Sequence, residues 1–305
     1  MFGKKLSMIY LPQDFPALQS LRAEGLAATA YAMGGPCSLP PAIPQGAKRV
    51  LLLNLMPHKA VTDLDIARTL AQTGEDVCLL LMKIAGQTYK TTPMAYVDAF
   101  YRDFECYAAA APTYDGLIIT GAPVEQIPFE DVRYWEALCR IIDWADRAVR
   151  STLYVCWGAQ AGLYHLYGVP KYALPEKRFG IFAQTVRLAS PLMEGLLPAF
   201  PMPNSRHTEV RAADILRHPS LRILADSPES GVGVVASTDH RRVFIVGHLE
   251  YEPLTLDKEY RRDLSRQLPI HQPEHYYRHD NPEAGVDFVW QAAAVQVYGN
   301  WLRHP

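Results

Sequence analysis

The 305-residue sequence has no long apolar run and little net charge. No stretch approaches the ~18–20 apolar residues that a membrane-spanning helix needs. The apolar run before Pro12 is too short for the core of a signal peptide, so we expect a cytoplasmic protein. The formal net charge of -2 argues against a general nucleic-acid binder, which would carry a basic excess.

Cysteine is also scarce. The five cysteines, at positions 37, 78, 106, 139 and 156, include no Cys-x-x-Cys pair. An odd number without paired spacing predicts neither a disulfide framework nor a structural zinc site. Most of these thiols are therefore expected to be small buried hydrophobic residues, and the open question is whether one of them has a chemical role.

What the sequence does contain is an ordinary globular composition, 49% hydrophobic and 20% charged. Short buried runs alternate with helical patterns, which predicts an α/β fold with a mostly parallel sheet flanked by helices. We expect an N-terminal arm or extension over residues 1–49 and a single α/β domain over residues 50–305. Beyond residue 171 we expect shorter strands and loops. The main predicted elements are strands at 50–54, 77–82, 116–120 and 152–155, a hairpin of 231–236 with 243–246, and a closing helix within 284–301.

The run at 152–155 leads directly into Cys156, and small residues such as Gly158 and Gly162 follow at once. A turn from strand to helix exposes the side chain at its apex and aims the first helical N–H groups at it. A thiol at that position is favoured as a thiolate. Taken alone, a cysteine at a strand end is more often a buried structural residue.

A second buried run, 243–246, is followed by His248 and Glu250. Residues two apart in an extended chain share a face, so Glu250 can orient His248 and His248 can serve Cys156 as a base. Polar residues can also simply cap a strand end. Nucleophile, base and orienting carboxylate together favour a catalytic triad.

The run at 116–120 ends in the turn Gly121–Glu125. Loops at the carboxyl ends of parallel strands converge, so this turn is expected beside Cys156 and His248. Gly121 permits a close backbone approach, and its N–H could join that of Trp157 in holding an oxyanion. A simple tight turn is the alternative.

A series of segments resembles the homoserine O-acyltransferases of methionine biosynthesis, often called homoserine transsuccinylases. The resemblance runs from about residue 50 to residue 301 and implies a class I glutamine-amidotransferase-like (flavodoxin-like) fold. It is carried by NLMP at 54–57, GLIITGAPVE at 116–125, STLYVCWGAQAGLYHLYG at 151–168, PEK at 175–177, SRHTEV at 205–210 and GHLEY at 247–251.

The resemblance also implies roles for single residues. The cysteine would accept the acyl group, the histidine would act as base, and the glutamate would be its partner. A guanidinium at the substrate site could bind the carboxylate of an amino acid with two parallel hydrogen bonds. On this basis catalysis is assigned to Cys156, His248 and Glu250, and substrate contacts to Lys177, Ser205 and Arg262.

The acyl group is predicted from Glu125. Relatives that use succinyl-CoA resemble one another in having glycine there, and those with glutamate prefer acetyl-CoA. A carboxylate in the acyl pocket fills space and repels the carboxylate of a succinyl group. We therefore expect a ping-pong transfer from the co-substrate acetyl-CoA to homoserine, with small-molecule substrates, no bound cofactor or metal, no nucleic-acid or membrane partner, and a homodimer as in similar proteins.

Other interpretations stay open. Relatives carry two basic residues and an Ile-Glu-Thr-Glu-like run after NLMP, whereas this chain has His58 and Asp63 there. Serine is therefore an alternative acceptor, since one methylene is worth only ~1–3 kcal/mol in discrimination. A Cys-His-Glu amidase or glutaminase and a non-catalytic binding protein are further alternatives. His271 and His275 would share a helical face and suggest a metal site, but Pro273 favours loop histidines.

Overall fold

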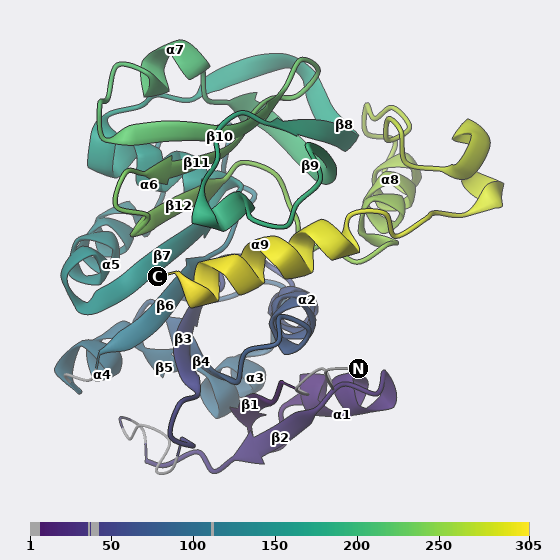
Figure 1. The fold of residues 1–305 in the computed structure, drawn as a ribbon. Helices are drawn as coiled ribbons and strands as arrows, with labels where there is room; N and C mark the ends of the chain where they lie inside the picture. The colour runs from purple at the N-terminus through teal and green to yellow at the C-terminus, as the bar shows by residue number, and fades with distance from the viewer. Residues whose placement is uncertain (1–6, 36, 38–42, 111–112, 305) are drawn as a thin grey trace.

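The computed structural model describes residues 7–35, 37, 43–110 and 113–304, and in them twelve strands form one sheet with helices on both faces (Figure 1). The strand order is β2-β1-β4-β3-β6-β7-β12-β11-β10-β8-β9, and β5 pairs with β4. The strands are β1 (Ile9–Pro12), β2 (Ala28–Tyr31), β3 (Lys48–Leu53), β4 (Val77–Lys83), β5 (Arg102–Asp103), β6 (Tyr114–Ile119), β7 (Val149–Val155), β8 (Tyr172–Val186), β9 (Ala199–Glu209), β10 (Leu221–Ser227), β11 (Gly231–Ser237) and β12 (Arg242–Ile245).

The path from β2 to β12 is the parallel part of the sheet, as predicted. Its central strands are apolar on both sides because helices cover both faces. One face packs against α1, α2 and α9, and the other against α4, α5 and α6; Figure 1 shows α9 running across the sheet near α2. The helices are α1 (Pro16–Ala23), α2 (Lys59–Ala71), α3 (Met94–Phe100), α4 (Phe104–Ala109), α5 (Trp135–Ala148), α6 (Trp157–Tyr167), α7 (Ala212–Ile215), α8 (Thr255–Ser265) and α9 (Gln291–Arg303).

The N-terminal segment differs from the expected arm. β1 pairs in parallel with both β2 and β4, so residues 9–31 extend the sheet at its edge. The expected boundary between residues 49 and 50 falls inside β3, which begins at Lys48. Residues 1–6, 36 and 38–42 of the predicted arm lie outside the described residues.

The sheet continues beyond β12 with antiparallel strands. The predicted hairpin is confirmed: β11 and β12 pair through Val234 with Ile245 and Val235 with Phe244. The expectation of short strands and loops after residue 171 is wrong for β8 and β9, which form a long antiparallel pair with Phe179 opposite Ser205. Both strands mix polar and apolar residues, so the sequence pattern did not identify them as long strands.

Cysteine pairing is a second correction. Cys37 and Cys106, which are 69 positions apart, form a disulfide between the segment before β3 and α4. The expectation of unpaired thiols is therefore wrong for these two residues. Sequence spacing carries no signal for a pair brought together only by the fold. Cys78, Cys139 and Cys156 are free.

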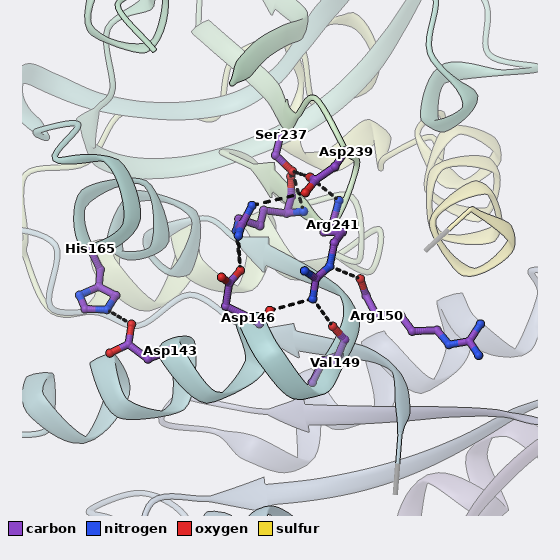
Figure 2. A network of polar contacts seen from close by, with 9 residues as sticks. Asp143, Asp146, Val149, Arg150, His165, Ser237, Asp239 and Arg241 are labelled. Atoms are coloured by element: carbon purple, nitrogen blue, oxygen red, sulfur yellow. Dashed lines mark hydrogen bonds and ion pairs between the residues drawn. The ribbon is translucent and has the colours of Figure 1, made fainter. Parts of the chain in front are cut away.

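Figure 2 shows a polar network that fixes the turn between β11 and β12 against α5. Arg241 donates hydrogen bonds to the carbonyl oxygens of Asp146 (2.7 Å) and Val149 (3.1 Å). A cation at this point satisfies carbonyl groups that lack partners at a helix C-terminus. Arg242 also binds the Asp146 carboxylate, at 2.7 Å. Since β12 begins at Arg242 and pairs with β7, the network anchors two of the strands that lead to the sequence-predicted residues.

Candidate active site

Cys156 lies between β7 and α6, at the carboxyl edge of the parallel strands. Its backbone has φ 52° and ψ −116°, a conformation that costs a non-glycine residue about 1–3 kcal/mol. The Cys156 N–H donates to the Ile245 carbonyl at 2.8 Å, which ties the end of β7 to β12. A Cβ at Gly158 would lie 2.7 Å from the Ile119 carbonyl oxygen, so only glycine lets α6 begin this close to β6. The strand-to-helix turn predicted from the sequence is confirmed.

His248 and Glu250 follow β12 and are almost fully buried. His248 Nδ1 and Glu250 Oε1 are 2.7 Å apart, and the His248 side chain also hydrogen-bonds Cys156. Burial opposes a charge on the imidazole, but the negative charges of Cys156 and Glu250 outweigh it and hold the pKa of His248 well above its usual value. The three side chains are thus arranged in the order Cys156, His248 and Glu250, as a nucleophile, its base and an orienting carboxylate would require.

The loop after β6 approaches Cys156 and His248 at Gly121. A Cβ built on this residue would lie 3.2 Å from the Cys156 Cβ and 3.6 Å from the His248 Cε1. Trp157 is the first residue of α6, where backbone N–H groups have no acceptor within the helix. The arrangement therefore puts a glycine loop and a helix N-terminus beside one thiol.

The three residues predicted to contact substrate converge on a fourth, Glu259 of α8. Its carboxylate accepts hydrogen bonds from Lys177 Nζ (2.7 Å) and Ser205 Oγ (2.9 Å). Arg262 lies 3.4 Å from the same carboxylate and donates a shorter hydrogen bond, of 2.7 Å, to Asp263. Two cations, a hydroxyl and a carboxylate from β8, β9 and α8 form one partly buried polar cluster. Glu259 was not singled out from the sequence, where it stands three positions before Arg262.

Tyr251 connects this cluster with the triad. Its ring stacks on the His248 imidazole, with centroids 3.9 Å apart and planes 11° from parallel. Burial raises the pKa of the Tyr251 hydroxyl well above its usual value, and the charges of Glu259 and Cys156 add to this effect. Tyr251 therefore contacts His248 directly and lies within electrostatic range of Glu259.

Comparison with known proteins supports a single family. The model of the family described as homoserine O-succinyltransferase matches residues 8–305. This chain belongs to that family. Membership makes it an acyltransferase that acts on homoserine.

Individual relatives of the acyltransferase cover nearly the whole chain. A Parabacteroides distasonis protein named homoserine O-acetyltransferase is 49% identical over 257 residues, 84% of this chain and 82% of its own length. A Bacteroides fragilis protein with the same name is 45% identical over 96% of this chain and 94% of its own length. The family is therefore named for succinyl transfer, whereas these two relatives are named for acetyl transfer.

Solved structures show the fold. A glutamine amidotransferase from Methylobacillus flagellatus superposes with a TM-score of 0.55 and 13% identity, covering 85% of this chain and 95% of the other. One from Thermotoga maritima gives the same TM-score at 11% identity, with 84% and 96% covered. The expectation of a glutamine-amidotransferase-like fold is confirmed.

Glu125 lies in the loop after β6 and is partly exposed. Thr208 Oγ1 lies 3.2 Å from Glu125 Oε2 and 2.8 Å from Gln160 Oε1. The fully buried Arg206 donates to the Thr208 carbonyl at 2.7 Å. Burial lowers the pKa of the Arg206 guanidinium, while the charges of Cys156 and Glu125 oppose that shift. Arg206, Gln160 and Thr208 were not identified from the sequence.

His58 and Asp63, which left the acceptor open, have different surroundings. His58 is exposed, whereas Asp63 is fully buried and accepts hydrogen bonds from Tyr101 Oη (2.6 Å) and Tyr96 Oη (2.8 Å). Burial raises the pKa of the Asp63 carboxyl, and these hydrogen bonds oppose the shift. Lys59 beside it is buried too, and burial lowers its pKa to about 8. Lysine is rarely buried, so the sequence did not suggest this cluster.

The histidine segment 271–279 is a loop, with a short 3₁₀ turn beginning at Arg278. Glu274 pairs with β8 through its backbone, donating to the Phe179 carbonyl at 2.9 Å. His275 Nε2 lies within hydrogen-bond distance of Glu229 Oε2, at 2.9 Å. Side-chain ligand atoms of Glu229, Glu274 and His275 lie within 4.8 Å of one another, but an exposed cluster of this kind does not by itself make a metal site. None of the described helices combines the length and the apolar composition of a membrane span.

Proposed function

We propose that this acyltransferase moves an acetyl group from acetyl-CoA to the hydroxyl of L-homoserine through an acyl-enzyme on Cys156. The observation that carries the proposal is the buried contact of His248 with Glu250 at 2.7 Å, on the histidine that hydrogen-bonds the thiol. The product, O-acetyl-L-homoserine, would serve methionine biosynthesis.

The first half-reaction begins with the Cys156 thiolate and the His248 imidazolium. The sulfur attacks the thioester carbon, and the tetrahedral oxyanion is stabilised by backbone N–H groups of Trp157 and Gly121. Collapse breaks the bond to the CoA sulfur, which leaves as a thiol with the proton from His248. The acetyl group then rests on Cys156.

The second half-reaction uses the same groups in reverse. His248 takes the proton of the homoserine hydroxyl, the oxygen attacks the acetyl carbon, and the Cys156 thiolate leaves. Lys177 and Arg262 are the cations for the amino-acid carboxylate, and Glu259 is the anion for the ammonium group. Substrate would thereby replace the internal contacts of Lys177 and Arg262 with Glu259.

The assignment of acetyl as the transferred group is supported by Glu125 and by the relatives named homoserine O-acetyltransferase. A carboxylate held near Cys156 disfavours an acyl chain that ends in a second carboxylate. Donor and acceptor are tested together by CoA release from acetyl-CoA and succinyl-CoA, each with homoserine or serine. We expect fast release only with acetyl-CoA and homoserine.

Each of the other possible outcomes contradicts a specific part of the proposed function. Faster release with succinyl-CoA contradicts the role of Glu125. Faster release with serine contradicts the acceptor. CoA release without any acceptor points to a hydrolase, and ammonia release from glutamine points to a glutaminase. Full transferase activity in Cys156→Ser contradicts the acyl-enzyme.

A further inference from the structure

Thr208 of β9 holds the side chain that is expected to select the acyl group. Its hydroxyl lies 3.2 Å from Glu125 Oε2, and no other side chain in the described ranges is hydrogen-bonded to that carboxylate. The Glu125 main chain is fixed independently, because Lys171 Nζ donates to the carbonyl oxygens of Glu125 (2.7 Å) and Ile127 (2.6 Å). The backbone of the loop and the carboxylate therefore have separate anchors.

Thr208 is itself held in place. It is 4% exposed, and its carbonyl oxygen accepts hydrogen bonds from Arg206 (2.7 Å) and from Gln160 Nε2 (3.2 Å). Gln160 is on α6, the helix that begins right after Cys156, and is almost fully buried. The position of the Thr208 hydroxyl is thus fixed relative to the nucleophile.

The hydroxyl has one proton and two acceptors within reach, Glu125 Oε2 at 3.2 Å and Gln160 Oε1 at 2.8 Å. A charged acceptor makes the stronger hydrogen bond, by roughly a factor of two. The charge of the buried Arg206 guanidinium attracts the Glu125 carboxylate toward the side of Thr208, whose carbonyl oxygen Arg206 binds.

We propose that Thr208 is a positioning residue that keeps the Glu125 carboxylate in the acyl pocket and so determines how strongly the enzyme prefers a short neutral acyl group over one ending in a carboxylate. The inference rests on the proposed function. Glu125 is partly exposed, so without the hydroxyl its side chain is free to rotate toward solvent and admit a dicarboxylic acyl group.

The test is the ratio of kcat/KM for acetyl-CoA to kcat/KM for succinyl-CoA, with homoserine saturating. Thr208→Val keeps the shape and removes the hydroxyl, and Thr208→Ser keeps the hydroxyl. We expect the ratio to fall about tenfold in Thr208→Val and to stay near the original value in Thr208→Ser. Thermal unfolding of both variants checks that each is folded.

The variant Glu125→Gly distinguishes a failure of the role of Thr208 from a failure of the proposed role of Glu125. An unchanged ratio in Glu125→Gly contradicts the role of Glu125 itself. A changed ratio there with an unchanged ratio in Thr208→Val overturns only the role of Thr208. In the double variant, Thr208→Val should add nothing to Glu125→Gly, because its effect acts through that carboxylate. An equal effect of Thr208→Val with and without Glu125 also overturns the inference.

Discussion

Lys177 Nζ lies 2.7 Å from Glu259 Oε1, so a cation assigned to the substrate is paired with a carboxylate of the chain. Ser205 and Arg262 contact the same carboxylate. An acceptor with one carboxylate and one ammonium group matches this set of charges. If this cluster binds the acceptor as proposed, Glu259 competes with the acceptor carboxylate for Lys177 and Arg262.

Replacing Glu259 should act on the acceptor half-reaction. In Glu259→Gln the ammonium group loses its anionic partner, so we expect the KM for homoserine to rise about tenfold. Acetyl-CoA-dependent formation of the acyl-enzyme should change little. Glu283→Gln, at a carboxylate whose side chain is 83% exposed near α8, is the matched control. A slowed first half-reaction with an unchanged homoserine KM would contradict this assignment.

The pH dependence should follow Glu250. Burial of His248 tends to lower its pKa, but the charges of Cys156 and Glu250 raise the pKa by more. Glu250→Gln removes one of these charges and so lowers that pKa. Since the first half-reaction needs protonated His248, the alkaline limb of kcat/KM for acetyl-CoA should move to lower pH. If kcat/KM falls in Glu250→Gln but its alkaline limb stays at the same pH, Glu250 only orients the His248 imidazole and does not set its pKa.

Gly121 should be intolerant of a side chain. A Cβ there would lie 3.2 Å from the Cys156 Cβ, tighter than an ordinary contact. We expect Gly121→Ala to lower kcat about tenfold or more, because a 1 Å displacement can cost about 100-fold. The unfolding temperature should change little. Wild-type kcat in this variant would show that the loop does not approach the reacting atoms.

Stability should depend on Asp65, which is buried on α2. Burial, followed by the charges of Glu252 and Glu250, raises its pKa to about 8, while Arg68 and Lys258 oppose the shift. Unfolded aspartate ionises near pH 4, so between about pH 4 and 8 the folded protein keeps a proton that the unfolded chain releases. This group therefore lowers stability increasingly as pH rises through that range.

Asp65→Asn cannot ionise and removes that cost. Its unfolding temperature relative to the original protein should increase from pH 5 to pH 8. Chemical unfolding at several pH values gives the same comparison as a free energy. A difference that is constant with pH would mean that Asp65 ionises normally in the folded state.

The sequence predicted those parts of the site that stand at the ends of buried strands. Cys156, His248 and Gly121 each follow an apolar run, and parallel strands bring such ends together. Glu259 and Thr208 carry no comparable signal: one is a charged residue in a polar helix, and the other one of many threonines. Their importance comes from contacts between distant segments, 54 and 83 positions apart in the sequence.

The fold was predictable to a similar extent. Strands with apolar residues on both faces, such as β3 and β4, were recognised from their composition alone. β1 has only four residues and β9 is interrupted by prolines and polar residues, so local pattern did not distinguish them from loops. Cys37 and Cys106 are joined by tertiary structure, which no local pattern contains.

The central claim is that the acyl group passes through Cys156. The most direct measurement is the intact mass of the enzyme after a brief exposure to acetyl-CoA without an acceptor. The account predicts a mass gain of one acetyl group, located on Cys156 by peptide mapping, lost when homoserine is added and not formed in Cys156→Ala. A protein that turns over homoserine while its mass never changes, or that carries the acetyl group elsewhere, would contradict the account.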